Sequence, residues 1–148
     1  FLLHGGDTHR MMFDSRTPLL LAIVPVWAGD SAAILFGKFF GKRKLAPTIS
    51  PKKTVEGAIA NFVFTAGIAP LVGIWVQIPF WPSLTVGIAA GILGQIGDLY
   101  ESWIKRQCNK KDSGTIFPGH GGVLDRLDSL LFPILFASLL LTTMQLAK

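Results

Sequence analysis

Residues 17–36 read TPLLLAIVPVWAGDSAAILF, and Asp30 is the only charged residue among them. At a rise of about 1.5 Å per residue, a helix of this length covers the roughly 30 Å hydrocarbon layer of a bilayer. Three more apolar windows follow, at residues 55–78, 83–104 and 122–146. Because backbone groups in lipid must be paired within their own segment, these windows predict helices. We therefore expect an all-α, polytopic transmembrane helix bundle of about four spans.

The composition of the whole chain agrees with a membrane protein. Half of the 148 residues are apolar and 16% are charged, whereas soluble domains carry about 25% charged residues. This composition argues against disorder and against a disulfide scaffold, since Cys108 is the only cysteine. No repeat or linker divides residues 1–148, so we expect a single membrane-embedded region. Because the chain begins at Phe1, we also expect it to be a fragment that lacks upstream spans.

The basic residues lie mainly in two of the connections between windows. Residues 37–54 hold six Lys and Arg with no acid, and residues 105–121 hold four, which together are ten of the 14 in the chain. Two spans separate these connections, so both lie on the same side of the membrane. The positive-inside rule predicts that this side is cytoplasmic. We expect a bacterial inner membrane, with an organelle membrane as the alternative. The net charge of +5 is accounted for in this way, without a nucleic-acid partner.

Charged residues within the windows mark a candidate site, because such residues cost several kcal/mol in a bilayer. They all fall near the basic connections and are Asp30, Asp98, Glu101, Asp125, Arg126 and Asp128. Asp125 and Asp128 are spaced to share one helix face. Carboxylates from separate helices could bind a hard cation through oxygen ligands. The alternative is that each Asp pairs with a nearby Lys or Arg, or reaches toward the interface.

Two further motifs suggest anion binding. Ser50 and Pro51 have the pattern of a helix N-cap followed by Pro at the first helical position, which predicts a helix starting there. Lys52 and Lys53 in its first turn would oppose the helix dipole and would suit a bound phosphate. The second motif, GTIFPGHGG at residues 114–122, surrounds His120 with glycines that permit close backbone approach to a ligand. Simple positive-inside topology and a structural histidine are the alternatives.

Four stretches of the sequence resemble the motifs of a known family. Residues 102–128 read SWIKRQCNKKDSGTIFPGHGGVLDRLD, and WAGD at 27–30, LAPTISPKKTVEG at 45–57 and GD at 97–98 lie upstream. These motifs resemble the phosphatidate cytidylyltransferase (CDP-diacylglycerol synthase) family over residues 17–146. Members of that family usually have more spans before this region, so the chain resembles their carboxy-terminal catalytic half.

The resemblance implies a reaction, a cofactor and partners. CTP and phosphatidate would give CDP-diacylglycerol and pyrophosphate with Mg²⁺, with a monovalent cation such as K⁺ beside it. The family also suggests a homodimer. The metal ligands implied are Asp98, Asp125 and Asp128, helped by Ser102. The other residues implied in catalysis or substrate binding are Asp30, Lys52, Lys53, Lys105, Arg106, Lys111, His120 and Arg126.

Other functions are compatible with parts of the sequence. A related cytidylyltransferase acting on an archaeal ether lipid would use the same chemistry. A CDP-alcohol phosphotransferase is disfavoured, because its motif begins with Asp-Gly and that pair does not occur here. An ion-coupled transporter or a structural membrane subunit would also contain apolar helices with buried acids. The acids cluster at one depth beside lysine-rich connections, which favours the transferase.

Overall fold

The architecture was obtained as a computed structural model, which describes residues 16–108 and 124–146. Within these ranges, side chains are described for residues 17–108 and 130–144. The elements, in chain order, are α2 (Arg16–Phe40), β1 (Lys44–Ala46), β2 (Ser50–Thr54), α3 (Val55–Trp75), α4 (Phe80–Gln107) and α5 (Leu124–Leu146). The expectation of an all-α membrane bundle is confirmed, with the addition of a small β-hairpin.

The helices follow the predicted windows closely. Three of them are long and apolar enough to cross a membrane, over Thr17–Phe40, Val55–Trp75 and Phe80–Gln107. α5 forms where the fourth span is expected, although the apolar part with described side chains is limited to Leu130–Met144. α2, α3 and α5 each contain an internal proline, which membrane helices tolerate because their neighbours satisfy the freed backbone groups.

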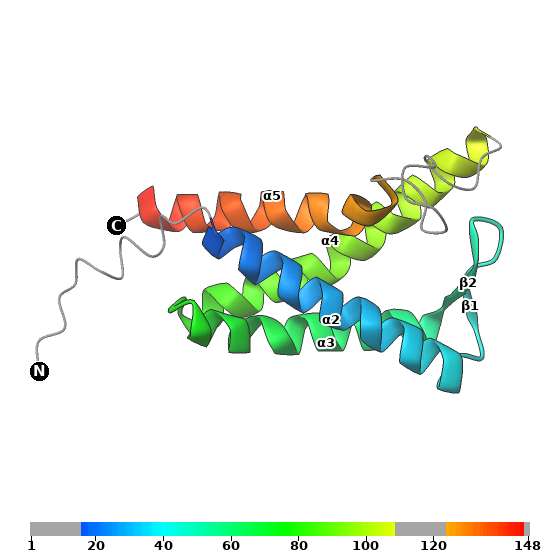
Figure 1. The fold of residues 1–148 in the computed structure, drawn as a ribbon, viewed down its shortest axis with the longest axis horizontal. Coiled ribbons are helices and arrows are strands. Elements are labelled where there is room, and N and C mark those ends of the chain that lie inside the picture. Colours follow the sequence, from blue (N-terminus) through cyan, green and yellow to red (C-terminus); the bar gives the residue numbers. More distant parts are fainter. Residues whose placement is uncertain (1–15, 109–123, 147–148) are drawn as a thin grey trace, which may run out of the picture.

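The helices form a bundle whose two ends differ (Figure 1). α2 packs along α3, while α4 contacts α3 on one side and α5 on the other. Apolar side chains fill the half of the bundle that lies away from the hairpin, with contributions from all four helices: Leu21, Ala22, Val72, Ile78, Val86, Ala137 and Leu141. The other half, near the hairpin, contains the polar side chains described below.

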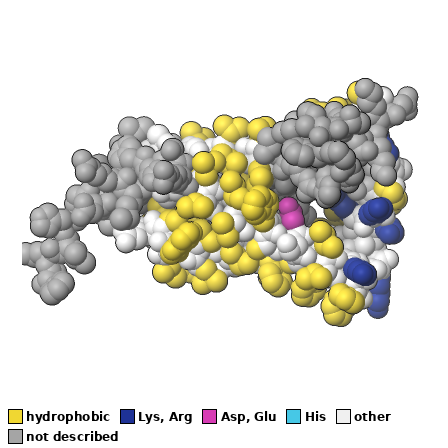
Figure 2. All heavy atoms as spheres, viewed as in Figure 1, with side chains coloured by type: hydrophobic (Ala, Val, Ile, Leu, Met, Phe, Trp, Pro, Cys, Tyr) yellow, Lys and Arg dark blue, Asp and Glu magenta, His cyan; other side chains and the backbone are white. Residues whose placement is uncertain are grey.

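The outer surface matches a lipid environment. Large apolar side chains on every helix are exposed, among them Trp27, Ile34, Leu71 and Leu135. On the face shown in Figure 2, hydrophobic side chains cover the middle of the bundle, while Lys and Arg gather at the hairpin end. A soluble monomer rarely exposes so much apolar surface. The distribution agrees with helices that contact acyl chains and a basic end that lies at the headgroups.

Aromatic pairs lie near both ends of α4. Phe80 and Trp81 contact edge to face at its start, with ring centroids 5.3 Å apart. Tyr100 and Trp103 stack near its end, with centroids 6.0 Å apart. All four side chains are exposed. Exposed aromatic residues at both ends of a helix are typical of a span whose termini reach the two membrane interfaces.

The β-hairpin corrects one prediction about the chain before α3. β2 pairs antiparallel with β1, so Ser50 does not cap a helix and Pro51 does not begin one. The cap is Thr54, whose Oγ1 accepts a hydrogen bond of 3.1 Å from the backbone N of Gly57. Pro51 lies exposed in a two-stranded ribbon, where the missing N–H is tolerated.

The carboxylate of Glu56 stabilises the start of this hairpin. Its Oε2 accepts hydrogen bonds from the backbone N of Lys42 at 3.1 Å and of Arg43 at 3.3 Å. These bonds hold the chain that leaves α2 against the first turn of α3. As a result, the hairpin is anchored at both its beginning and its end, and Lys52 and Lys53 on β2 lie at the cavity.

Candidate active site at the basic end of the bundle

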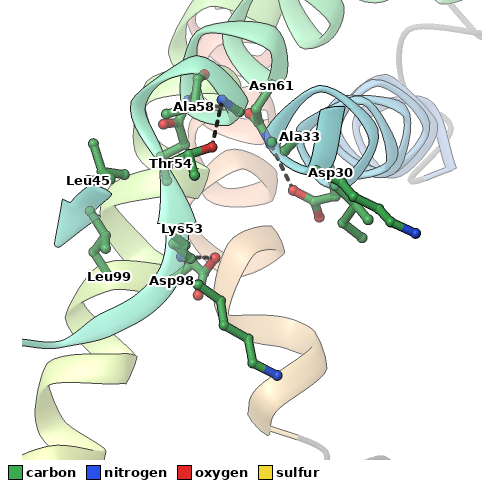
Figure 3. A pocket seen from close by; sticks show the side chains of 15 residues that line it. Asp30, Ala33, Leu45, Lys53, Thr54, Ala58, Asn61, Asp98 and Leu99 are labelled. Atoms are coloured by element: carbon green, nitrogen blue, oxygen red, sulfur yellow. Dashed lines mark hydrogen bonds and ion pairs between the residues drawn. The ribbon is translucent and has the colours of Figure 1, made fainter. Parts of the chain in front are cut away.

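A cavity of about 510 Å³ opens among α2, β2, α3 and α4. Its charged lining residues come from three different elements and are Asp30, Lys38, Lys52, Lys53 and Asp98. Figure 3 shows the side chains of Asp30, Lys53 and Asp98 around this space. The structure therefore brings together residues that are distant in sequence, as predicted for Asp30, Lys52, Lys53 and Asp98.

Lys53 and Asp98 form an ion pair at the wall of the cavity. Their side chains are 28% and 36% exposed, respectively. The pair connects β2 to α4, since Lys53 is on the hairpin and Asp98 lies in the last third of the helix. The alternative prediction, in which an intramembrane Asp pairs with a nearby Lys, thus describes Asp98 in this structure. An ammonium and a carboxylate at one cavity wall can bind an anion and a cation side by side.

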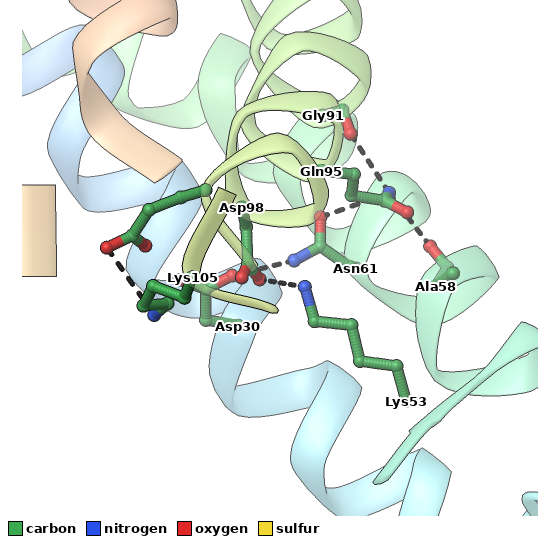
Figure 4. A network of polar contacts seen from close by, with 9 residues as sticks. Asp30, Lys53, Ala58, Asn61, Gly91, Gln95, Asp98 and Lys105 are labelled. Atoms are coloured by element: carbon green, nitrogen blue, oxygen red, sulfur yellow. Dashed lines mark hydrogen bonds and ion pairs between the residues drawn. The ribbon is translucent and has the colours of Figure 1, made fainter. Parts of the chain in front are cut away.

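Two uncharged amides continue the polar wall into the bundle (Figure 4). Asn61 Nδ2 donates a 2.8 Å hydrogen bond to Asp30 Oδ1. Gln95 Nε2 donates its two hydrogens to Gly91 O at 2.9 Å and Ala58 O at 3.1 Å, and it also lies 3.4 Å from Asn61 Oδ1. Both amides line the cavity. The chain of contacts crosses from α4 through α3 to α2.

Asn61 and Gln95 were not identified from the sequence. The sequence prediction rests on charged residues within the apolar windows and on residues of the quoted motifs, whereas these two are neutral and lie outside those motifs. The signal was nevertheless present, because an amide in a membrane helix also needs a partner and tends to face the bundle interior. Each is flanked by apolar residues in its window.

Other predicted residues lie on the same part of α4 but outside this cavity. Lys105 pairs with Glu101, with 3.4 Å between Nζ and Oε1, and Glu101 is only 7% exposed. Arg106 donates from Nε to the backbone O of Ile49 at 3.1 Å, which ties α4 to the hairpin. Ser102 is half-buried one helical turn after Asp98. Substrate roles for these residues stay predictions.

The remaining predicted residues cannot be placed in the site. Lys111 and His120 lie outside the described residues. Asp125, Arg126 and Asp128 fall in the first turns of α5, which packs against α4, but their side chains are not described. Their helical backbone keeps Asp125 and Asp128 at the i, i+3 spacing of one face.

A metal centre is not formed by the described side chains alone. Among them, no three His, Cys, Asp or Glu residues lie close enough together to hold an ion. Asp30 and Asp98 nevertheless face one cavity, and their carboxylate oxygens are the donors that hard divalent cations prefer. The donor chemistry fits such an ion, and its ligand set stays a prediction.

Comparisons with known proteins identify the family of the chain. A family model described as "Cytidylyltransferase family" matches residues 7–144. A phosphatidate cytidylyltransferase of Staphylococcus haemolyticus is 44% identical over 129 residues, covering 85% of this chain and 49% of the relative. Relatives with the same name from Staphylococcus saprophyticus and Bacillus subtilis are 43% and 46% identical, over 95% and 84% of this chain and 56% and 47% of their own lengths.

The chain spans about half the length of the curated relatives it matches. The family match, in contrast, extends over nearly all of the chain and includes all of the described bundle except the last two residues of α5. The resemblance noted in the sequence is thereby confirmed. The chain belongs to the cytidylyltransferase family.

Proposed function

We propose that the protein containing this chain transfers the cytidylyl group of CTP to phosphatidate, forming CDP-diacylglycerol and pyrophosphate. The observation that carries this proposal is the cavity in which Lys38, Lys52 and Lys53 meet Asp30 and Asp98 at the basic end of an apolar bundle. The relatives named phosphatidate cytidylyltransferase support the same reaction. A site at the end of a membrane bundle can receive a water-soluble nucleotide and a lipid phosphate.

The reaction requires cationic side chains near two anionic substrates, and the lysines of the cavity can provide them. A phosphate oxygen of phosphatidate forms a bond to the α-phosphorus of CTP, and the bond from that phosphorus to the bridging oxygen breaks, which releases pyrophosphate. The attacking phosphate is already ionised near neutral pH, so a strong general base is not required. Bringing two anions together is the main obstacle, and fixed cationic side chains reduce their repulsion.

We propose Mg²⁺ as the cofactor of this reaction. Asp98 would hold it together with Asp125 and Asp128 from the first turns of α5, and a monovalent cation such as K⁺ could bind nearby. The bound ion would neutralise phosphate charge at the reacting centre. Lys52 and Lys53 would bind the phosphates of CTP, while Asp30 would contact a part of the nucleotide that donates hydrogen bonds.

The basic end is proposed to face the cytoplasm of a bacterial cell, where CTP is available. The gathering of Lys and Arg at the hairpin end supports this orientation, and the curated relatives come from bacteria. The cavity lies at one end of the bundle and its charged residues do not continue through the apolar half. This placement favours a surface reaction over ion transport across the membrane.

The test is incorporation of radiolabelled CTP into chloroform-soluble product by the purified full-length protein. We expect product with phosphatidate and Mg²⁺, and none after EDTA is added. A diether lipid phosphate in a parallel reaction distinguishes the ether-lipid alternative. Ion flux in liposomes that does not depend on CTP, with no labelled lipid, would contradict the proposal and support transport.

A further inference from the structure

The polar contacts among Gln95, Asn61 and Asp30 all run the same way, because the side-chain nitrogen of each amide faces an oxygen of the next residue. Gln95 Nε2 is fixed by two backbone carbonyls, Gly91 O and Ala58 O, at 2.9 and 3.1 Å. Its contact with Asn61 Oδ1 at 3.4 Å places the oxygen of that amide toward α4. The nitrogen of Asn61 therefore points toward α2, where it donates to Asp30 Oδ1 at 2.8 Å. Each amide determines how the next polar group is oriented.

The packing of α2 against α3 makes this contact possible. Gly29 immediately precedes Asp30, and a Cβ at that position would lie 2.9 Å from the backbone O of Asn61 and would overlap Thr65 Oγ1. Only a residue without a side chain permits such an approach. Asn61 itself is 7% exposed. The amide is thus held in a tight interface, and its one charged partner in this network is Asp30.

We propose that Asn61 and Gln95 are positioning residues, which hold the carboxylate of Asp30 toward the cavity so that it can accept hydrogen bonds from CTP. This inference rests on the proposed function, and it adds two residues to the site. A carboxylate repels a triphosphate, so in this pocket it can serve the nucleotide through a bound cation or through a hydrogen-bond donor of the nucleotide. CTP offers such donors in its ribose hydroxyls and in the cytosine amino group.

The geometry explains why a neutral amide suits the position next to Asp30. A lysine there would neutralise the carboxylate and compete with the nucleotide for it. A leucine would leave the carboxylate without this donor in an apolar interface, which is costly. An amide donates a hydrogen bond to one carboxylate oxygen and carries no charge of its own. The contact of Gln95 Nε2 with Asn61 Oδ1 at 3.4 Å favours the same orientation of the Asn61 amide.

The first experiment measures CTP affinity and thermal unfolding of the full-length protein. Asn61→Leu should raise KM and the calorimetric Kd for CTP about tenfold, the effect expected from losing one hydrogen bond to a charged group. Gln95→Leu should raise them less, about threefold, because it acts through Asn61. The matched control is Thr65→Val, a fully buried position on α3 one turn from Asn61 that does not line the cavity.

The second experiment separates positioning from simple support of the fold. The exchange Asp30→Asn with Asn61→Asp keeps a hydrogen-bonded amide and carboxylate in the interface but moves the charge from α2 to α3. We expect the exchange variant to unfold at a thermal midpoint close to that of the wild type and above that of Asn61→Leu. Its KM for CTP should stay about tenfold above the wild-type value.

Several outcomes would overturn the inference. They are an unchanged KM in Asn61→Leu, a Thr65→Val variant as impaired as Asn61→Leu, an exchange variant with wild-type KM, or an exchange variant as unstable as Asn61→Leu. If the wild type converts CTP normally in these cases, the proposed function stands without this inference. Absence of CTP binding by the wild type would instead overturn the proposed function, and the inference with it.

Discussion

The two halves of the bundle are built from the same helices but differ in what lies between them. Away from the hairpin, Leu21, Val72, Val86 and Leu141 pack into a continuous apolar core. Near the hairpin, α2, α3 and α4 instead enclose a cavity with charged and amide side chains. Polar groups at a membrane-embedded interface reduce packing and need partners. From this difference we expect the apolar half to stabilise the bundle and the polar half to hold the site of the proposed reaction.

The largest expected effect tests the polar half. Asp98→Asn removes the negative charge of this one side chain at the cavity and keeps its shape. We expect CDP-diacylglycerol formation to fall at least about a hundredfold, since a fixed charge at a reacting phosphate is worth this much. The thermal midpoint should change little, because the ion pair with Lys53 is partly exposed and contributes only about 0–1 kcal/mol. Asp125→Asn should behave in the same way.

Thr85→Val on α4 is the matched control, since it removes only an exposed hydroxyl that donates to Trp81 O. Turnover by this variant should equal that of the wild type. If Asp98→Asn kept near-normal turnover with Mg²⁺, the assignment of chemistry to the polar half would be wrong.

The next effect tests the apolar half. At Gly73 an added Cβ would overlap the Ser83 hydroxyl and lie 2.6 Å from Ser83 Cβ, where α3 meets the start of α4. Gly73→Ala should therefore lower the free energy of unfolding by about 1–3 kcal/mol, as overpacking does. KM and kcat of the folded protein should stay within about twofold of the wild type. Unfolding in detergent, followed by circular dichroism, measures the first quantity.

Gly67→Ala provides the comparison on the same helix. An added Cβ there meets nothing within 4 Å, so the substitution should stabilise the protein by about 0.5–1 kcal/mol through helix propensity alone. Equal destabilisation by both variants would show that packing at Gly73 is not special. A large loss of activity in Gly73→Ala would break the proposed division between the halves.

The helices could be predicted from the sequence because the membrane constrains them strongly. A long apolar run must form a helix in lipid, whatever its local propensity. The ends were less accurate, since α2 continues to Phe40 and α3 ends at Trp75. The hairpin was missed because it depends on contacts between residues far apart in the chain, such as the bonds from Lys42 and Arg43 to Glu56. Such contacts leave no local pattern.

The site was predicted in part for a related reason. Charges in apolar windows are rare, so Asp30 and Asp98 were found, and topology placed them at one depth. Asn61 and Gln95 were not predicted, because a neutral amide in an apolar window is a weaker signal of a site than a charge. The partner of each residue also depends on helix rotation, which an almost uniformly apolar window does not reveal. The pairing of Lys53 with Asp98 could be seen only in the folded chain.

A smaller effect is expected on the hairpin side of the cavity. Lys53→Gln should raise KM for CTP about tenfold and change kcat little, because the ammonium binds phosphate mainly through charge. The KM of this variant should also depend less on salt than that of the wild type. Lys44→Gln is the matched control, since Lys44 is exposed on β1 and does not line the cavity. Equal effects of the two substitutions would indicate a general role for basic charge rather than a site at Lys53.

The smallest effect should occur at Arg106, which ties the end of α4 to the hairpin at the polar end of the bundle. Its Nε donates to the carbonyl of Ile49, and its side chain is exposed. A single exposed hydrogen bond of this kind is worth about 0.5–1.5 kcal/mol. Arg106→Gln should therefore loosen the hairpin and raise KM for CTP only about two- to threefold. Limited proteolysis of the hairpin and steady-state kinetics measure these two effects. An increase of tenfold or more, without faster cleavage, would instead place the Arg106 guanidinium directly on a substrate phosphate and extend the polar half to the end of α4.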